Sequence, residues 1–563
     1  MSDSTQKELT HLEELIHEGK FDEALQFVRY IEENEKITPI HRFTCAIFKN
    51  IIFIKKGLYK EALKSLEMIL QENNNMRNTL QGVKAFIAMA EALQCLGKLN
   101  ESLNAIKEGE RIVRTCKHEF PTNDLQRKNA SLLYRKGCVM QKKGDLDQAM
   151  NYHSQGLTIR ERIGNKYDIA ASLNSIGMIY DLMGDWDRAL EYYQRSLTLR
   201  NEVGNKQEIA MSLNNIGVVY LLKGQMNQAL DLYEQSLALF KQLGSKQYIA
   251  GSLTNIGIIH RVKGNLDLAL DYYTQSLDIR REIGDKQEIA RLFNNMGAIY
   301  ADKGDWNQGL EYYKQCLIIQ EQIGNNHKIS ITLLQYISLI AAIMASEERQ
   351  SLNDQNLLDQ ASFNLNKFQI IHEKTNSKII SQHYRLAKAI VMKMSENLDD
   401  KIKAQNLFQQ IIRGGSLEFE QQIFAMINLC YILFEIFILS GEQSYLLDLR
   451  NQLDMILDLA KQNHLHMVKL QILFLIGKLD IIQMKLENAR SLLKKAKSEA
   501  HNRGYDLIEQ HCDNEISKLQ KYKKIDTILE IQESERINLQ KKQTQDFFDY
   551  LKAVAIHLSD LDM

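Results

Sequence analysis

The sequence predicts an all-α fold, namely a superhelical solenoid of antiparallel helix pairs. Residues 167–326 consist of four consecutive copies of one 40-residue unit, and each copy carries three glycines in the same frame. The composition also favours helix, because the chain has two prolines and is rich in Leu, Ile, Lys, Glu and Gln. Self-similarity at a fixed period of this length is typical of helical solenoids, in which each unit packs only against its neighbours.

The first part of the chain, residues 1–120, is predicted to be a degenerate arm of the same unit. The turn between the two helices of a unit recurs there as GKFDEAL at Gly19, GLYKEAL at Gly57 and GKLNESL at Gly97. In each case the glycine ends one helix, and a second helix with apolar periodicity follows it. The loop around Pro121 lengthens the next interval, so we place a boundary there and expect the regular array over residues 121–326.

Within the regular array, each unit is predicted to contain a first helix, a tight turn, a second helix and a glycine-containing loop. A short polar side chain after the turn glycine can cap the second helix, and this position holds Asp145, Asp185, Asn265 and Asp305. Glycine adopts the left-handed conformation at a helix end without a steric penalty, which predicts this role for Gly204, Gly244 and Gly284.

The array is predicted to continue as irregular repeats over residues 327–504. The expected helices span 327–346, 376–394, 398–413, 417–440 and 442–463, and a well-formed unit returns at 475–496. Residues 505–563 are expected to be long or amphipathic capping helices, since a terminal element must cover the last apolar face. The final stretch, DFFDYLKAVAIHL, is amphipathic, so a movable or autoinhibitory role for this segment stays open.

The composition argues against several classes of protein. A formal net charge of −1 gives no global attraction to nucleic acid or to an anionic membrane. The seven cysteines form no CxxC motif, so neither a disulfide framework nor a metal site is expected, and no cofactor is predicted. The N-terminus lacks an apolar signal core, which favours a cytoplasmic location.

One stretch, Ile423 to Leu439, is apolar enough to cross a membrane. It contains Asn428 and Glu435 and lies between two repeat-like segments. Polar groups of this kind are costly inside a bilayer. We therefore favour a buried solenoid helix over a transmembrane one, and expect no stable membrane insertion.

Each unit carries a signature in both of its helices. The first helix has an apolar residue, an apolar-glycine pair and an aromatic residue, as in Leu173, Ile176-Gly177 and Tyr180. The second helix has an alanine, an aromatic residue and a small residue, as in Ala189, Tyr193 and Ser196. The glycine is expected to face the alanine, so that the two backbones approach closely. This pattern resembles the tetratricopeptide repeat, most strongly over residues 124–326, and the resemblance implies a right-handed superhelix.

The 40-residue length and the Gly-Asn/Asp-Lys linker are more particular. They resemble the long repeats of Pins/LGN-type spindle adaptors, kinesin light chain and prokaryotic regulatory repeat proteins. Those families bind peptides or proteins on the concave surface that the first helices line. The resemblance therefore implies a non-catalytic scaffold or adaptor that binds an extended peptide or a helix of an unidentified protein partner. A regulatory sensor with movable C-terminal helices is the alternative.

The expected binding residues are asparagines of the first helix. A helix has 3.6 residues per turn, so the positions three and two before the packing glycine lie on the face opposite the second helix. A carboxamide both donates and accepts, so it can pair with a peptide unit of any sequence. In the families named above, such a row holds an extended peptide, and the alternative is that the residues pair with one another as polar filler. The row consists of Asn174, Asn214, Asn215, Asn255, Asn294 and Asn295.

Three arginines are predicted to lie on the same inner surface, namely Arg135, Arg261 and Arg291. Guanidinium groups bind carboxylates with two parallel hydrogen bonds, so these residues would meet acidic side chains of a ligand.

Overall fold

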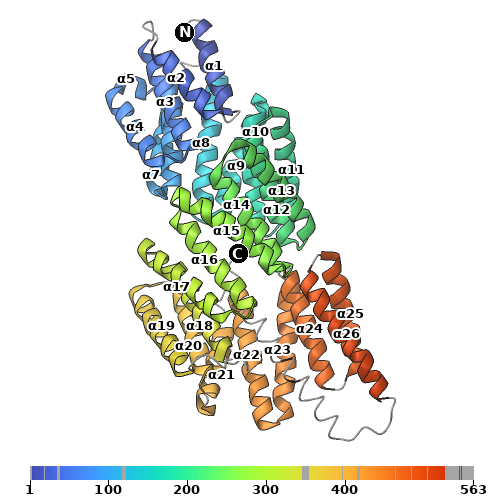
Figure 1. Ribbon diagram of the computed structural model, residues 1–563. Helices are drawn as coiled ribbons and strands as arrows, with labels where there is room; N and C mark the ends of the chain where they lie inside the picture. Colours follow the sequence, from blue (N-terminus) through green and yellow to red (C-terminus); the bar gives the residue numbers. More distant parts are fainter. Residues whose placement is uncertain are drawn as a thin grey trace. The chain divides into compact units, whose positions relative to one another are not determined.

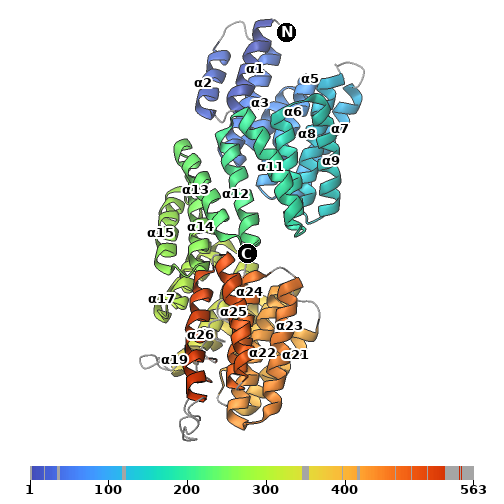
Figure 2. The same cartoon turned by 90° about the vertical axis from the view of Figure 1, so that its right-hand side faces the viewer.

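The computed structural model describes residues 3–17, 20–33, 38–116, 122–344, 354–395, 397–414, 419–462, 465–483, 485–503 and 505–526, together with Thr544 and Phe547. These residues form 26 α-helices and no strand, which confirms the all-α prediction (Figures 1 and 2). The helices divide into two compact units. The first unit comprises Met1–Tyr220 and Asp231–Gly244, and the second comprises Leu221–Leu230 and Ser245–Met563.

The first unit contains the N-terminal arm and the beginning of the regular array. Its helices are α1 (Asp3–His17), α2 (Phe21–Glu32), α3 (Pro39–Lys55), α4 (Tyr59–Glu72), α5 (Asn74–Arg77), α6 (Leu80–Cys95), α7 (Leu99–Thr115), α8 (Thr122–Lys142), α9 (Leu146–Ile163), α10 (Lys166–Leu182), α11 (Trp186–Val203) and α12 (Lys206–Leu222). Helix α12 and the next helix, α13 (Met226–Leu243), contribute residues to both units.

The second unit contains the rest of the regular array and the irregular repeats. Its helices are α14 (Lys246–Val262), α15 (Leu266–Ile283), α16 (Lys286–Asp302), α17 (Trp306–Ile323), α18 (Asn326–Met344), α19 (Asp354–Lys374), α20 (Lys378–Lys393), α21 (Leu398–Arg413), α22 (Phe419–Ser440), α23 (Gln443–Gln462), α24 (His466–Ile482), α25 (Leu486–Arg503) and α26 (Asp506–Asp526). The predicted helices of the irregular repeats are confirmed within two residues at each end.

The two helices of a regular repeat meet at the glycine of the first helix. A Cβ atom on Gly177 would lie 2.8 Å from Cδ1 of Tyr193, which is itself fully buried. Gly257 and Tyr273 repeat the same contact in the second unit. The sequence predicted that the glycine faces an alanine, and a Cβ on Gly257 would indeed lie 3.4 Å from the Ala269 carbonyl oxygen, but the tyrosine ring is closer still. The missing side chain therefore makes room for an aromatic ring, which fills more of the space between the helices.

The turn and cap residues largely follow the sequence prediction. The carboxylates of Asp145, Asp185 and Asp305 accept hydrogen bonds from the third backbone amide that follows each of them. Gly204 ends α11 with a φ of 82°, in the left-handed region that favours glycine. The prediction for Asn265 was wrong in one respect, because its side chain makes no capping hydrogen bond although it precedes α15.

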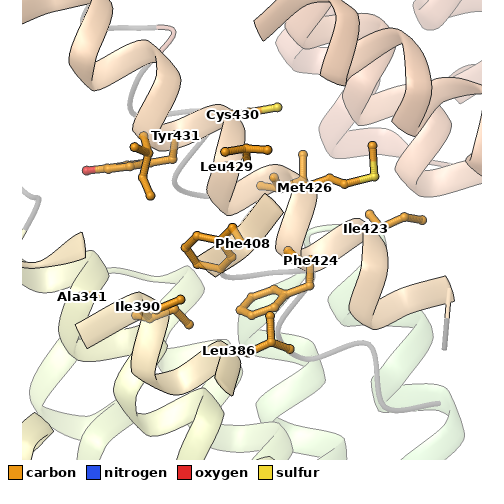
Figure 3. Close-up of a cluster of buried hydrophobic side chains, with 14 of the residues drawn as sticks. Ala341, Leu386, Ile390, Phe408, Ile423, Phe424, Met426, Leu429, Cys430 and Tyr431 are labelled. Carbon is orange, nitrogen blue, oxygen red and sulfur yellow. The ribbon is translucent and has the colours of Figure 1, made fainter. Parts of the chain in front are cut away.

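Helix pairs continue through the irregular repeats, where α18 packs on α19, α20 on α21, α22 on α23 and α24 on α25. A large apolar cluster joins these pairs. In Figure 3, the side chains of Leu386, Phe408 and Phe424 gather between α20, α21 and α22. Helix α26 packs on α25 and follows the last complete pair.

Two helices of the second unit are long and apolar enough to span a membrane, namely α18 and α22. In each of them, 72% of the apolar window is buried inside the protein. The core helix of a repeat protein has the same length and composition, so this is weak evidence for a membrane span.

The four segments predicted from the sequence, with boundaries at residues 121, 327 and 505, stay a prediction. The contacts divide the chain at a different place, between Gly244 and Ser245 inside the regular array.

Candidate functional site

The asparagines of the first unit meet across neighbouring repeats. Asn174 lies on α10, and Asn214 and Asn215 lie on α12, all of them half-buried. The Asn215 amide donates a hydrogen bond from Nδ2 to Oδ1 of Asn174, at 3.2 Å. The two side chains therefore face the same side of adjacent first helices.

The asparagines of the second unit are also half-buried and are bonded to neighbouring helices. Oδ1 of Asn294 accepts a hydrogen bond from the hydroxyl of Thr332 on α18, at 3.5 Å. Asn295 is hydrogen-bonded to the Tyr273 hydroxyl. Asn255 has an interaction as well. Because a carboxamide can make up to four hydrogen bonds, one such contact leaves capacity for a ligand.

Each of the three predicted arginines is paired with a carboxylate of the chain itself. Arg261 donates from Nε to Asp302, at 3.0 Å, and the exposed Arg291 donates to Glu288 at the same distance. Arg135 on α8 bonds to Glu91 on α6. An acidic ligand would therefore compete with these internal carboxylates or share their arginines.

Glu91 is the centre of a charged group that the sequence did not reveal. Its other carboxylate oxygen lies 3.1 Å from Nζ of Lys55 on α3. Burial acts to raise the pKa of Glu91, but Arg135 and Lys55 together hold it at about 2. The carboxylate thus stays charged and links three first helices, namely α3 and α6 of the N-terminal arm and α8 of the regular array. The irregular spacing of the arm hid this group, since none of its members recurs at the 40-residue period.

Asp181 is a second residue that sequence reasoning missed. It lies on α10, two helical turns after Asn174, and is half-buried. Its Oδ1 is buried and has no hydrogen-bond partner among the described residues. Burial raises the pKa of this carboxyl to about 6. The corresponding residues of the next repeats are Leu221, Arg261 and Ala301, so no periodic signal marked this position.

A row of buried arginines recurs at the 40-residue period but serves the fold. Nη1 of Arg160 donates to Oγ of Ser172 at 2.7 Å and to the carbonyl of Asp168 at 2.9 Å. Arg200 makes the same pair of bonds to Ser212 and Glu208. These guanidinium groups are almost fully buried, so they join each second helix to the next first helix and are not available to a ligand.

Family models described as tetratricopeptide repeat match residues 129–202, 205–285 and 289–323. These residues are tetratricopeptide repeats. The matches cover the helices that carry all the predicted binding residues. The tetratricopeptide repeats support a role in protein interaction or regulation, and repeats of this family are generally non-catalytic.

Several solved structures match this chain at low identity and low TM-score. The apo form of the quorum sensor NprR from B. thuringiensis is 16% identical, and the match covers 64% of this chain and 98% of that one with a TM-score of 0.43. BtubC from P. vanneervenii is 19% identical over 40% of this chain and 92% of its own, with a TM-score of 0.36. The kinesin light chain repeats from Podosopora anserina are 16% identical over 36% of this chain and 98% of theirs, with a TM-score of 0.30.

These likenesses concern the fold alone, because both the identities and the TM-scores are low. No curated protein matches the sequence. Among the described residues, no group of three or more His, Cys, Asp or Glu side chains is placed to hold a metal ion.

Proposed function

We propose that this protein is a cytoplasmic scaffold or adaptor whose tetratricopeptide repeats hold an extended peptide of a partner protein on the face of the first helices that carries the asparagines. The placement of Asn215 beside Asn174 on one half-buried face supports this proposal, whereas the hydrogen bond between them is equally expected if the row only pairs internally. This placement brings carboxamides of neighbouring repeats together, and each keeps unused donors or acceptors.

The spacing of the repeats suits an extended chain. Neighbouring packed helices lie about 8–10 Å apart, and an extended peptide rises about 3.3 Å per residue. One repeat therefore corresponds to about three peptide residues, so every third peptide group can meet an asparagine of the next repeat. Met178, Val218 and Ile258 are partly exposed one residue after each packing glycine and would add apolar contact.

Asp181 extends the proposed surface in the first unit. Its half-buried carboxylate would accept a hydrogen bond from a ligand N–H or from a basic side chain. Such a contact would stabilise the charged form of the carboxyl, which burial disfavours in the free protein.

The test replaces one asparagine in each unit and measures partner capture. The immobilised chain and its Asn215→Ala and Asn255→Ala variants are exposed to cytosol, and retained proteins are quantified by mass spectrometry. We expect partners of the wild-type chain to be depleted on both variants, with melting temperatures within a few degrees of the wild type. The matched control is Asn201→Ala, because Asn201 is an exposed asparagine on the second helix α11. Equal capture by all four proteins would refute the asparagine assignment.

A regulatory sensor is the second candidate. The observation that favours it is the burial of Phe547, which shows that the C-terminal segment contributes a side chain to the core of the second unit. In this role the segment would leave its position when a ligand binds. Partner capture by a chain that ends at residue 526 would then exceed capture by the full chain.

A further inference from the structure

The first helices α3, α6 and α8 of the first unit pack side by side and carry two rows of side chains across one face (Figure 2). Each helix contributes two residues that are seven positions apart, which is two turns along the same side of a helix. The Glu91 row consists of Lys55, Glu91 and Arg135, and the lysine row consists of Phe48, Lys84 and Lys128.

The Glu91 row has a carboxylate at its centre. Glu91 on the middle helix lies 3.1 Å from Nζ of Lys55 on one side and bonds to Arg135 on the other. Against the effect of burial, these two cations hold the pKa of Glu91 at about 2. One carboxylate therefore joins three neighbouring helices, because it accepts charge-assisted hydrogen bonds from both sides.

The lysine row has a cation at its centre instead. Nζ of Lys84 lies 3.6 Å from the ring centroid of Phe48 and bonds to Glu13, which belongs to α1. On the other side of Lys84, the side chain of Lys128 on α8 is half-buried. Its amine makes no hydrogen bond or ion pair to any described residue, and it keeps some contact with solvent. Among the described residues, no carboxylate bonds to both lysines in the way that Glu91 joins its two neighbours.

The surroundings of Lys128 disfavour its charged form. Burial lowers the pKa of the Lys128 amine to about 8, and the cations Lys84 and Arg127 act in the same direction. Glu13 and Asp124 act in the opposite direction but do not restore the ordinary value. A carboxylate between the two lysines would favour both ammonium groups, because an opposite charge at short range offsets the cost of burial.

The charges around the lysine row favour single carboxylates over a chain of phosphates. Glu13, Glu91 and Asp124 lie among the cations and would repel the continuous negative charge of a nucleic acid. A glutamate or aspartate side chain needs only the space between two lysines. Helix α10, which carries Asn174, packs next to α8. A peptide held by the asparagines could therefore continue onto the lysine row within the first unit.

We propose that the lysine row binds an acidic stretch of the partner peptide, with one Glu or Asp carboxylate bridging Lys84 and Lys128 in the way that Glu91 bridges its own neighbours. The inference rests on the proposed function in one respect, namely that the ligand is a peptide on the face of the first helices. It adds the chemistry of the segment that reaches α6 and α8. The ligand carboxylate would share Lys84 with Glu13, since an ammonium group has three donors.

The first experiment measures binding of a defined acidic probe to the full chain. The probe is a fluorescein-labelled peptide of four Ser-Glu repeats with blocked termini, and a Ser-Gln peptide is its uncharged counterpart. Fluorescence anisotropy is recorded at low ionic strength, where ion pairs are least screened. We expect the wild-type chain and Lys128→Arg to bind the acidic probe. Binding of the Ser-Gln peptide, and binding of the acidic probe to Lys128→Gln, should be at least about tenfold weaker, as for the loss of a charged hydrogen bond.

The matched control is Lys107→Gln, because Lys107 is exposed on the second helix α7 and the substitution changes the net charge equally. This variant should bind the acidic probe like the wild type. Equal binding by Lys128→Gln and Lys107→Gln would overturn the proposal, as would the absence of binding to the wild-type chain at up to about 1 mM probe.

Two further outcomes separate this inference from its alternatives. An oligothymidylate of the same charge that binds more tightly than the acidic peptide, and also through Lys128, would assign the lysine row to nucleic acid and overturn the proposal. Reduced partner capture by the asparagine variants, together with unchanged probe binding by Lys128→Gln, would refute the present inference alone and leave the proposed function standing.

A second measurement needs no variant and covers the case in which Lys128→Gln does not fold. Acetic anhydride reacts with neutral amines, and a bound carboxylate lowers the neutral fraction of an amine by raising its pKa. A saturating concentration of the acidic probe should therefore slow acetylation of Lys128 in the wild-type chain by at least about threefold, while acetylation of Lys107 stays unchanged. Mass spectrometry of the digested protein measures both rates. An unchanged rate at Lys128 would overturn the proposal.

Discussion

Arg200 donates a hydrogen bond from Nη1 to the hydroxyl of Ser212, at 2.7 Å, across the junction between α11 and α12. The same nitrogen donates to the carbonyl of Glu208, at 2.9 Å. Arg160 and Ser172 show the same geometry one 40-residue repeat earlier. In the sequence of the next repeat, Phe240 stands at the arginine position and Ser252 at the serine position, and the Ser252 hydroxyl has no hydrogen-bond partner in the described part of the chain. The arginine therefore serves to satisfy polar groups buried between successive repeats.

Replacing Arg200 by Met should destabilise the first unit by about 2–4 kcal/mol, because the Ser212 hydroxyl and the Glu208 carbonyl lose their common donor in a buried place. Urea denaturation followed by circular dichroism measures the change. Arg195→Met is the control, since Arg195 is about half exposed and lies 4.0 Å from Glu161. That variant should stay within about 0.5 kcal/mol of the wild type. Equal effects of the two substitutions would contradict this account of Arg200.

Two glycines of α14 should respond to alanine in opposite directions. A Cβ on Gly257 would lie 2.5 Å from Cε1 of Tyr273, so Gly257→Ala is expected to destabilise the second unit by about 1–3 kcal/mol through overpacking. A Cβ on Gly251 would meet only Nη2 of Arg280, at 3.8 Å. Gly251→Ala should therefore stabilise the helix by about 0.5–1 kcal/mol, through helix propensity alone. Hydrogen exchange of the α14 amides reports both changes, and shifts of the same sign would be inconsistent with the packing described.

His153 should make the stability of the first unit sensitive to acid. It occupies the position of Tyr193, is fully buried, and neither of its ring nitrogens has a partner among the described residues. Burial, together with Arg160 and Arg135, lowers its pKa to about 4. The unfolded chain takes up a proton near pH 6.5, so stability is lost as the pH falls from about 6.5 to 4, by up to about 3 kcal/mol.

In a His153→Tyr variant this contribution to the pH dependence should disappear. Urea midpoints measured at pH 7, 5.5 and 4.5 give the slope for both proteins. His11→Gln is the control, because His11 is largely exposed and the wild-type slope should persist in it. A slope that survives in His153→Tyr would show that other groups cause the acid sensitivity.

Asp181 should make the first unit more stable as the pH falls, which is opposite to the effect of His153. Its pKa is raised to about 6, above the unfolded value of about 4, so the folded state binds the proton more tightly. The cost of the charged form is present at pH 7 and is relieved as the pH falls through about 6 toward 4. Asp181→Asn should therefore stabilise the first unit by about 1–2 kcal/mol at pH 7 and by little at pH 4. Urea midpoints at the two pH values measure this, and destabilisation at pH 7 would mean that the carboxylate has a partner in solution.

The regular part of the fold could be predicted because its signals are local and repeated. The turn glycines, the aspartate caps and the apolar periodicity recur in each unit, so the positions of the helices followed from them. The irregular helices were also predicted, since α20, α21 and α23 have apolar periodicity between polar loops and α22 is a long apolar run. The tyrosine over Gly177 was not predicted, because sequence spacing does not say which rotamer fills the space that a glycine leaves.

For the candidate binding residues too, some features could be predicted from the sequence and others could not. The alignment of Asn174 with Asn215 followed from the repeat length and the helical period. The partners of the arginines did not, since the acids that pair with Arg135 and Arg261 lie on other helices at distances that no local pattern encodes. Asp181 carries no periodic signal, and only its burial makes it unusual.

By itself the sequence determined that this chain is a stack of helix pairs and which face of each first helix carries asparagine, because both properties depend on residues within one or two turns of each other. The tertiary structure decided which polar groups are already satisfied and which are not, as for Arg200 and Asp181. It also decided that Phe547 lies against Phe434, because contacts between distant segments depend on how whole helices pack and not on local spacing.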